Sequence, residues 1–282
     1  MAEVFGFAVG DNSGEAERHR RSKLCPFNNR VPNCTKDKAK EPLGVCSIFD
    51  GGRTIVTCPV RFREKWLIAT DSAQFFFPEN ATWTTLTEIR LKDRNGESAG
   101  NIDHVLASYD ERGKIVDFGS VEVQAVYISG NIRNPFEYYM KDTKKNAGMS
   151  WREQEHYPRA DFLSSSRKRL APQLIYKGGI LKAWGKKSAV ALDRHFFATL
   201  PKLEQVPKSD ADIAWLVYDL SFNGTGFALT LHETIYTKFE PALLRITQSL
   251  PGKLSDFIQT LQTKLDEKLE NPPNTETLTS LK

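Results

Sequence analysis

The chain has 282 residues and a mass of 31.9 kDa, with 40% hydrophobic and 26% charged residues. This balance excludes a disordered or fibrous protein and indicates a globular one with a sizeable core. No apolar run approaches the roughly 20 residues that a membrane-spanning helix needs, and the start of the chain has no signal-peptide pattern. We therefore expect a cytoplasmic protein with no membrane partner.

The N-terminal part, residues 1–60, contains all four cysteines of the chain: Cys25, Cys34, Cys46 and Cys58. In a reducing cytosol, four thiolates are more often metal ligands than disulfide partners. Their spacing, C-x8-C-x11-C-x11-C, has no CxxC pair, and several prolines and glycines between them favour loops. We predict an irregular four-cysteine segment that binds zinc or iron. The alternative is four unrelated buried thiols.

The second predicted domain, residues 61–282, begins with three successive strands at 82–91, 102–107 and 115–128. The first strand ends at Asn95-Gly96, a strong hairpin signal, and a polar turn at 110–114 precedes the third. The third strand carries Glu122 and Gln124 on one face and Val121, Val123 and Ala125 on the other. Two polar residues therefore face inward from a strand that reads as buried.

The register of these strands follows from reflecting each hairpin through its turn. Reflection places Glu88 opposite Asp103 and Asp103 opposite Glu122. Carboxylates on neighbouring strands repel unless a cation lies between them, and Mg²⁺ prefers such oxygen ligands together with a substrate phosphate. The alternative is that these acids face solvent, and a bulge at Gly119 would shift the alignment.

The segment 131–187 is basic, with 13 Lys or Arg against 5 Asp or Glu, whereas the whole chain carries only +4. Aromatic and amide side chains lie among these cations, a composition that suits contacts to nucleic-acid phosphates. The alternative is an ordinary solvated face. The candidate DNA-binding residues are Arg133, Asn134, Arg152, Arg159, Arg167, Lys168 and Arg169.

The last third of the chain supplies core strands and a helix. Residues 188–192 and 213–218 are apolar runs typical of buried strands. Five apolar residues between Leu254 and Leu269 repeat every three or four positions and predict a helix with one apolar stripe. We expect this stripe to pack on the core, with a dimer contact as the alternative.

The pattern D-x18-E-x-Q, formed by Asp103, Glu122 and Gln124, resembles the PD-(D/E)XK nuclease signature. Together with Glu88, the four-cysteine segment and the run at 195–201, it extends over most of the chain. In this combination the sequence resembles the NotI family of type II restriction endonucleases. The likeness departs from the general PD-(D/E)XK pattern at Ile102, where proline is expected, and at Gln124, where lysine is expected.

The resemblance implies an α+β PD-(D/E)XK fold, a mixed sheet flanked by helices, in a homodimer with iron on the cysteines. It implies the active-site set Glu88, Asp103, Glu122 and Gln124, in which Asp103 and Glu122 hold Mg²⁺. The expected reaction is Mg²⁺-dependent hydrolysis of double-stranded DNA at a GC-rich palindrome, leaving 5′-phosphates. A separate DNA methyltransferase would accompany such an enzyme.

Two other functions fit the same residues. The first is a non-catalytic DNA-binding protein that uses the four-cysteine module and the basic segment while the acids are inert. The second is a repair or structure-selective nuclease on the same core. Substitution of Asp103 distinguishes the first alternative, and mapping of the cut ends distinguishes the second.

Overall fold

The computed structural model describes residues 1–28, 31–37, 40–150 and 157–270. Two compact units divide the chain, Met1–Thr247 and Gln248–Lys282. In the second unit, the helix predicted from the apolar stripe is present as α9 (Leu254–Glu270). Among the described helices, none combines the length and the hydropathy that crossing a membrane requires.

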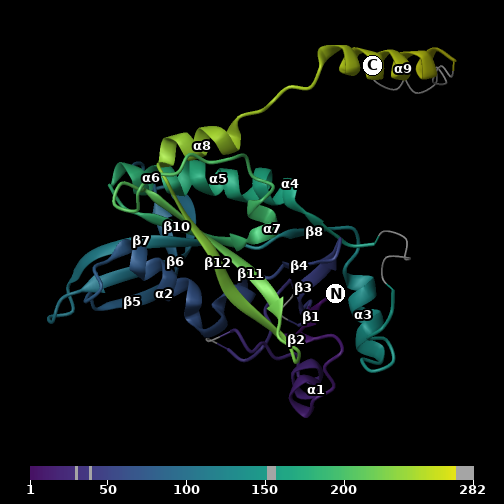
Figure 1. Cartoon of the computed structure of the whole chain (residues 1–282), viewed down its shortest axis with the longest axis horizontal. Coiled ribbons are helices and arrows are strands. Elements are labelled where there is room, and N and C mark those ends of the chain that lie inside the picture. Colours follow the sequence, from purple (N-terminus) through teal and green to yellow (C-terminus); the bar gives the residue numbers. More distant parts are fainter. Residues whose placement is uncertain (29–30, 38–39, 151–156, 271–282) are drawn as a thin grey trace. The chain divides into compact units, whose positions relative to one another are not determined.

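A six-stranded sheet forms the centre of the first unit, in the order β12-β11-β10-β7-β6-β5 (Figure 1). Its strands are β5 (Trp83–Lys92), β6 (Ser98–Tyr109), β7 (Ile115–Gln124), β10 (Ser188–Asp193), β11 (Ile213–Phe222) and β12 (Phe227–Thr237). β10 runs parallel to both β7 and β11, and the other neighbouring pairs are antiparallel. The predicted mixed sheet and the two predicted core strands are confirmed.

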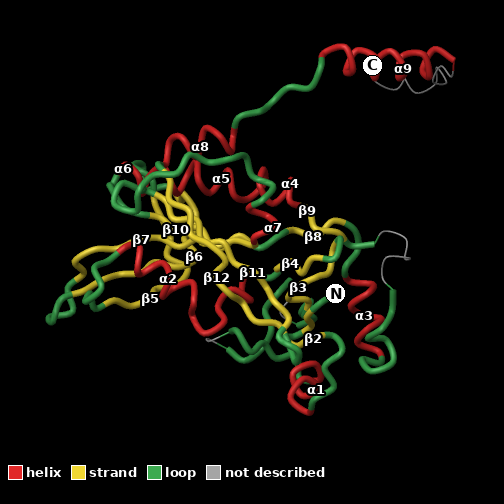
Figure 2. The backbone as a smooth tube through the Cα atoms, viewed as in Figure 1, coloured by secondary structure: helices red, strands yellow, loops and turns green. Residues whose placement is uncertain are grey.

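Helices cover both faces of this sheet (Figure 2). On one face α2 (Leu67–Phe76) packs against Val121 of β7 and Ala191 of β10. On the other face, a long helix spanning 162–183 and α8 (Phe239–Thr247) pack against Val190 and Leu192 of β10. Because side chains alternate along a strand, β7 and β10 are buried on both faces.

The long helix alternates between α-helical and π-helical turns. Its parts are α4 (Phe162–Ser165), η3 (Ser166–Leu170), α5 (Ala171–Gln173), η4 (Leu174–Gly178) and α6 (Gly179–Ala183), of which η3 and η4 are π-helical. Pro172 lies in the middle, where it has no N–H to donate and its ring crowds the preceding turn. A widened turn relieves this crowding, so proline explains why the helix is not regular.

Shorter elements complete the first unit. They are η1 (Pro59–Trp66), β8 (Tyr127–Ser129), α3 (Arg133–Lys141), β9 (Arg159–Asp161) and α7 (Arg194–Phe197). β8 and β9 pair with each other in a two-stranded sheet that precedes the long helix. The middle of the basic segment is thereby tied to the chain just after β7.

The N-terminal region is more regular than we predicted. It contains a four-stranded sheet in the order β2-β1-β3-β4 and one helix. The elements are β1 (Glu3–Val4), β2 (Phe7–Ala8), α1 (Gly14–Arg21), β3 (Val45–Asp50) and β4 (Arg53–Val56). The two-residue strands β1 and β2 are too short for a sequence pattern to show, and the prolines and glycines on either side of β3 and β4 favoured loops.

A buried ion pair ties the N-terminal sheet to the rest of the first unit. The guanidinium of Arg61 lies 3.0 Å from the carboxylate of Glu3, and neither side chain is exposed to solvent. Arg61 also bonds the carboxylate of Glu64 at 2.6 Å and donates to the backbone oxygen of Phe227 on β12 at 3.0 Å. With so many acceptors, the guanidinium is satisfied although it is buried.

Both hairpins of the β5-β6-β7 meander have wider turns than predicted. In each, an aspartate at the start accepts backbone N–H groups from inside the turn: Asp93 from Asn95 at 2.8 Å, and Asp110 from Arg112 at 3.0 Å. Gly96 adopts a φ of 81° in the first turn. Each hairpin also has one shift in its pairing, at Leu91/Lys92 in the first and at Ser108/Tyr109 in the second. Each bulge offsets the wider turn, so the predicted register returns beyond it.

The interior register is confirmed. Thr87 pairs with His104 and Ile89 with Ile102, so Glu88 and Asp103 lie between paired neighbours. His104 pairs with Val121, the last pair of these two strands. Asp103 and Glu122 are the next residues beyond that pair, one on each strand. Gly119 does not shift the alignment, because it pairs with Leu106 in the same register.

Gly119 generates a test of the packing between β7 and α2. A methyl group added there would lie 2.5 Å from ring atoms of Phe76, which is itself buried. We expect Gly119→Ala to lower the free energy of unfolding by about 1–3 kcal/mol through overpacking. Gly226→Ala is the matched control, because a methyl group there meets no atom within 4 Å. Urea unfolding of both variants makes the comparison, and equal stability would contradict this packing.

Candidate active site

The candidate site lies where β6 and β7 separate. Their pairing ends at His104 and Val121, and from there β7 continues beside β10, with Glu122 next to Val190 and Gln124 next to Leu192. Asp103 occupies the gap: its carboxylate accepts the backbone N–H of Val123 at 2.9 Å. The separation of the two strands therefore brings the side chain of Asp103 to β7 in place of a backbone partner.

Glu122 is a buried carboxylate, with only 7% of the residue exposed. Burial and, after it, the neighbouring charge of Asp103 together raise its pKa to about 8, against the opposing effect of Lys177. The ammonium of Lys177 lies 2.6 Å from Glu122 Oε2. Two carboxylates thus share one close lysine at this point.

Gln124 follows Glu122 on the same face of β7 and is fully buried. Its Nε2 donates to Oε1 of Gln173 on α5. The Oε1 atoms of Gln124 and Glu122 are both buried without a hydrogen-bond donor among the described residues. Buried acceptors of this kind usually have partners, so these two oxygens mark a place where a ligand would supply them.

Glu88 and Asp103 line the same pocket, of about 460 Å³, between the β5-β6 hairpin and the cysteine segment. Glu88 has a φ of 57° and lies between Thr87 and Ile89, which pair with His104 and Ile102 of β6. A non-glycine residue in this left-handed region is a local distortion of the kind found at functional sites. Arg63 and Arg169 line the same pocket.

The four predicted active-site residues are thus brought into one region. Asp103 connects its two parts, since it lines the pocket with Glu88 and interacts with Glu122. The sequence did not single out Lys177, Gln173 or Arg63. The sequence feature that could have indicated Gln173 and Lys177 is their four-residue spacing, which places both on one side of a helix.

The four cysteines also meet. Cys25, Cys34, Cys46 and Cys58 line one small cavity, and none is in a disulfide. Burial raises the pKa of Cys25 to about 11, and the neighbouring thiols of Cys34 and Cys58 contribute to this rise. Four thiolates could coexist here only around a cation. Within the described ranges, however, no group of three or more His, Cys, Asp or Glu side chains has an arrangement that could hold a metal ion.

The candidate DNA-binding residues do not form one cluster. Arg133 is paired with Asp37, and Asn134 follows it in α3. Arg159 lies on β9, whereas Arg167, Lys168 and Arg169 lie on η3. Arg152 lies outside the described residues. Of the described candidates, Arg169 alone lines the pocket of Glu88 and Asp103, and its guanidinium lies 6.0 Å from the ring centre of Tyr127.

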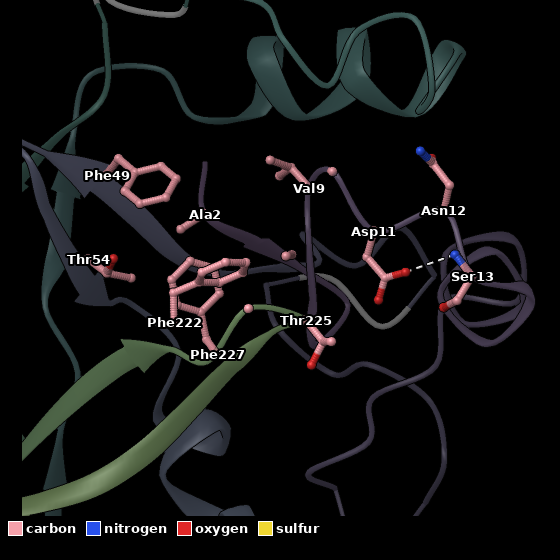
Figure 3. A pocket seen from close by; sticks show the side chains of 13 residues that line it. Ala2, Val9, Asp11, Asn12, Ser13, Phe49, Thr54, Phe222, Thr225 and Phe227 are labelled. Atoms are coloured by element: carbon pink, nitrogen blue, oxygen red, sulfur yellow. Dashed lines mark hydrogen bonds between the residues drawn. The ribbon is translucent and has the colours of Figure 1, made fainter.

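Another pocket, of about 880 Å³, lies between the tip of the β11-β12 hairpin and the N-terminal residues (Figure 3). The side chains of Phe49, Phe222 and Phe227 line one part of it. Asp11 is the one charged residue among the described residues that line it, and its carboxylate accepts the N–H of Ser13 at 2.8 Å. None of the predicted site residues lies here, so this pocket is not the candidate active site.

Comparison with known families agrees with the geometry. The model of the family described as "Restriction endonuclease NotI" matches residues 3–230, which is more than half of the 282-residue chain. No curated protein matches the chain. The matched range contains the cysteine cavity, the acids on β5, β6 and β7, and the long helix.

The carboxylate pair leads to a stability prediction. We expect Asp103→Asn to raise the free energy of unfolding in EDTA by about 1 kcal/mol, because it removes the charge that destabilises the ionised form of Glu122. The amide oxygen of asparagine can still accept the N–H of Val123. Urea unfolding without divalent metal measures the difference.

Asp117→Asn is the control for that experiment. Asp117 lies on β7, the strand of Glu122, and pairs with Lys186 at 2.6 Å, so its replacement removes an attraction at a partly exposed site. Its effect should be zero or slightly destabilising. A loss of stability in Asp103→Asn as large as that in the control would refute the repulsion.

Proposed function

The chain belongs to the NotI restriction endonuclease family, and on that premise we propose that this type II restriction endonuclease cuts double-stranded DNA with the site at Asp103 and Glu122. The observation that carries the proposal is the meeting of these two acids where β6 and β7 separate. The mixed sheet with helices on both faces supports a PD-(D/E)XK fold.

Magnesium fits the donor set. Asp103 and Glu122 would hold the ion, since the two carboxylates lie together beside one lysine and Oε1 of Glu122 is buried with no donor among the described residues. Bound there, Mg²⁺ supplies positive charge at the scissile phosphate and lowers the pKa of a nearby water. Glu88, which lines the same pocket as Asp103, would help to bind a second ion.

The residues of the chain have separate tasks in the proposed hydrolysis. Gln124 presents Oε1 beside Glu122 and would orient the attacking water by accepting its hydrogen. Arg169 and Arg63 line the same pocket and would contact phosphates of the DNA backbone. Attack in line with the 3′-oxygen would leave 5′-phosphate ends.

The finer properties follow from the likeness to the NotI family. We propose a homodimer, because two copies related by a two-fold axis read a palindrome and cut both strands. A GC-rich palindrome is the first sequence to test, and arginines that bond two atoms of a guanine would suit it. A separate DNA methyltransferase would protect the host DNA from such an enzyme.

Cleavage of DNA is the direct test. Wild-type protein incubated with plasmid and viral DNA in Mg²⁺ should give discrete fragments, and EDTA should abolish them. We expect Asp103→Asn to cut slower by about 10³-fold or more, because the metal and the charge that it brings are lost. Asp117→Asn, on the neighbouring strand β7, should cut like the wild type. Sequencing of the ends gives the recognition site and the overhang.

Each alternative function predicts a different result in that experiment. A non-catalytic DNA-binding protein would retain salt-sensitive DNA binding and give no cleavage with Mg²⁺. A structure-selective nuclease would cut branched or damaged DNA and leave no constant end sequence. Cleavage that is equally strong in Asp103→Asn would remove this site from the mechanism.

We also propose that the cysteine cavity binds one iron or zinc ion. All four thiols line the same cavity, and four sulfur ligands suit either metal. Such an ion would hold together a region whose strands have only two to six residues.

Metal analysis of the purified protein tests this proposal. We expect about one iron or zinc atom per chain by mass spectrometry. Cys46→Ser should lose the metal and unfold at a lower temperature, since it replaces a fully buried ligand. Wild-type protein that is purified without metal and has four free thiols would contradict a structural metal. Stability that a chelator does not change would contradict it as well.

A further inference from the structure

The long helix contributes two side chains to the acids of β7. Lys177 of η4 lies 2.6 Å from Oε2 of Glu122, and Gln173 of α5 accepts a hydrogen bond from Nε2 of Gln124. Lys177 also donates to the backbone oxygen of Asn101 on β6 at 2.8 Å. Only 5% of Lys177 is exposed, so this lysine is a buried residue of the core and not a surface charge.

The spacing of the two contacts matches. Residues two apart on a strand are separated by about 6.6 Å, and residues four apart on a helix by about 6 Å along its axis. Glu122 and Gln124 are two apart on β7, and Lys177 and Gln173 are four apart on the helix. One helix can therefore reach both polar side chains of the strand at once.

The π-helical turns keep these side chains aligned. In a regular α-helix each step of four residues rotates the side chain by about 40°, so residues eight apart no longer face the same way. A π-helical turn contains more residues and rotates the chain in the opposite sense over the same step. The turns η3 and η4 thereby let Arg169, Gln173 and Lys177 face the candidate site together.

Each contact restrains one terminal atom and leaves the other without a partner. Glu122 is bonded through Oε2 and Gln124 through Nε2, while their Oε1 atoms lack donors within the described part of the chain. A side chain restrained at one end has its remaining atom fixed in direction. Two oxygens of β7 are thus oriented before any ligand arrives.

We propose that Lys177 and Gln173 are positioning residues of the nuclease site, which aim Oε1 of Glu122 and of Gln124 at the metal and the attacking water. This inference rests on the function proposed above. Lys177 also brings a positive charge to a site in which Gln124 stands where the PD-(D/E)XK pattern has lysine. The cation would then come from the helix and not from the strand.

The first experiment separates binding from cleavage. We expect Lys177→Met and Gln173→Leu to reduce the single-turnover cleavage rate about 10²-fold, because misplaced groups lose rate even when they are still present. Their affinity for DNA in EDTA should stay within about twofold of the wild type. Gln173→Glu retains an acceptor for Gln124 and should recover most of the rate. Lys202→Met, at an exposed lysine, is the control.

A second experiment needs no catalysis. In EDTA, Lys177→Met should lower the unfolding midpoint, because it removes the cation beside the buried carboxyl of Glu122. In a Glu122→Gln background the same substitution should cost less, because the contact is already changed. Strictly additive losses would overturn the contact, and this readout stands even if a single variant cannot be assayed for cleavage.

The outcomes distinguish the two proposals. If the wild type cuts DNA and Asp103→Asn does not, the nuclease function holds; Lys177→Met and Gln173→Leu that then cut at the wild-type rate refute the positioning role. If the wild type does not cut with Mg²⁺, the proposed function fails. The unfolding experiment then still decides whether Lys177 and Glu122 are coupled.

Discussion

The change of partner along β7 is the constraint on which the rest of the structure depends. Up to Val121 the strand pairs with β6 on one side, and beyond it the neighbour that remains is β10 on the other. The parallel connection from β7 to β10 needs a crossover, which the long helix provides, and this helix covers the face that carries Glu122. The separation of β6 from β7 therefore places Asp103 beside Glu122. The crossover helix places Lys177 beside the same Glu122 carboxylate.

The sequence predicted the strands of this site better than their turns. Alternation put Glu122 and Gln124 on one face of a buried strand, and reflection gave the register that β6 and β7 adopt. Both hairpin turns were predicted too tight, and each error was offset by a bulge near the turn. Aspartates that accept N–H groups inside a turn widen it without a change in the hydrophobic alternation. Register is thus set by the buried face, and turn geometry adapts to it.

The helical half of the site could not be predicted in the same way. Lys177 lies 55 residues from Glu122 along the chain, and nothing in the local sequence relates the two. Periodicity assumes a regular α-helix, whereas Pro172 and the π-helical turns change which side chains share a face. The cysteines present the opposite case: their clustering in the sequence predicted that they meet, although the two-residue strands around them went unseen.

The distribution of charge explains why a basic segment is a weak guide to the DNA-binding surface. Five of its cations pair with acids from other parts of the chain: Arg133 with Asp37, Lys144 with Glu17, Lys177 with Glu122, Lys182 with Asp212 and Lys186 with Asp117. Much of the local excess of positive charge is therefore balanced within the fold. Arg159, Arg167 and Lys168 are exposed, and Arg169 faces the pocket of the acids. These four cations, on β9 and at the start of the long helix, are therefore the ones we propose for DNA contacts, and Lys141 and Lys145 are further exposed cations of the segment.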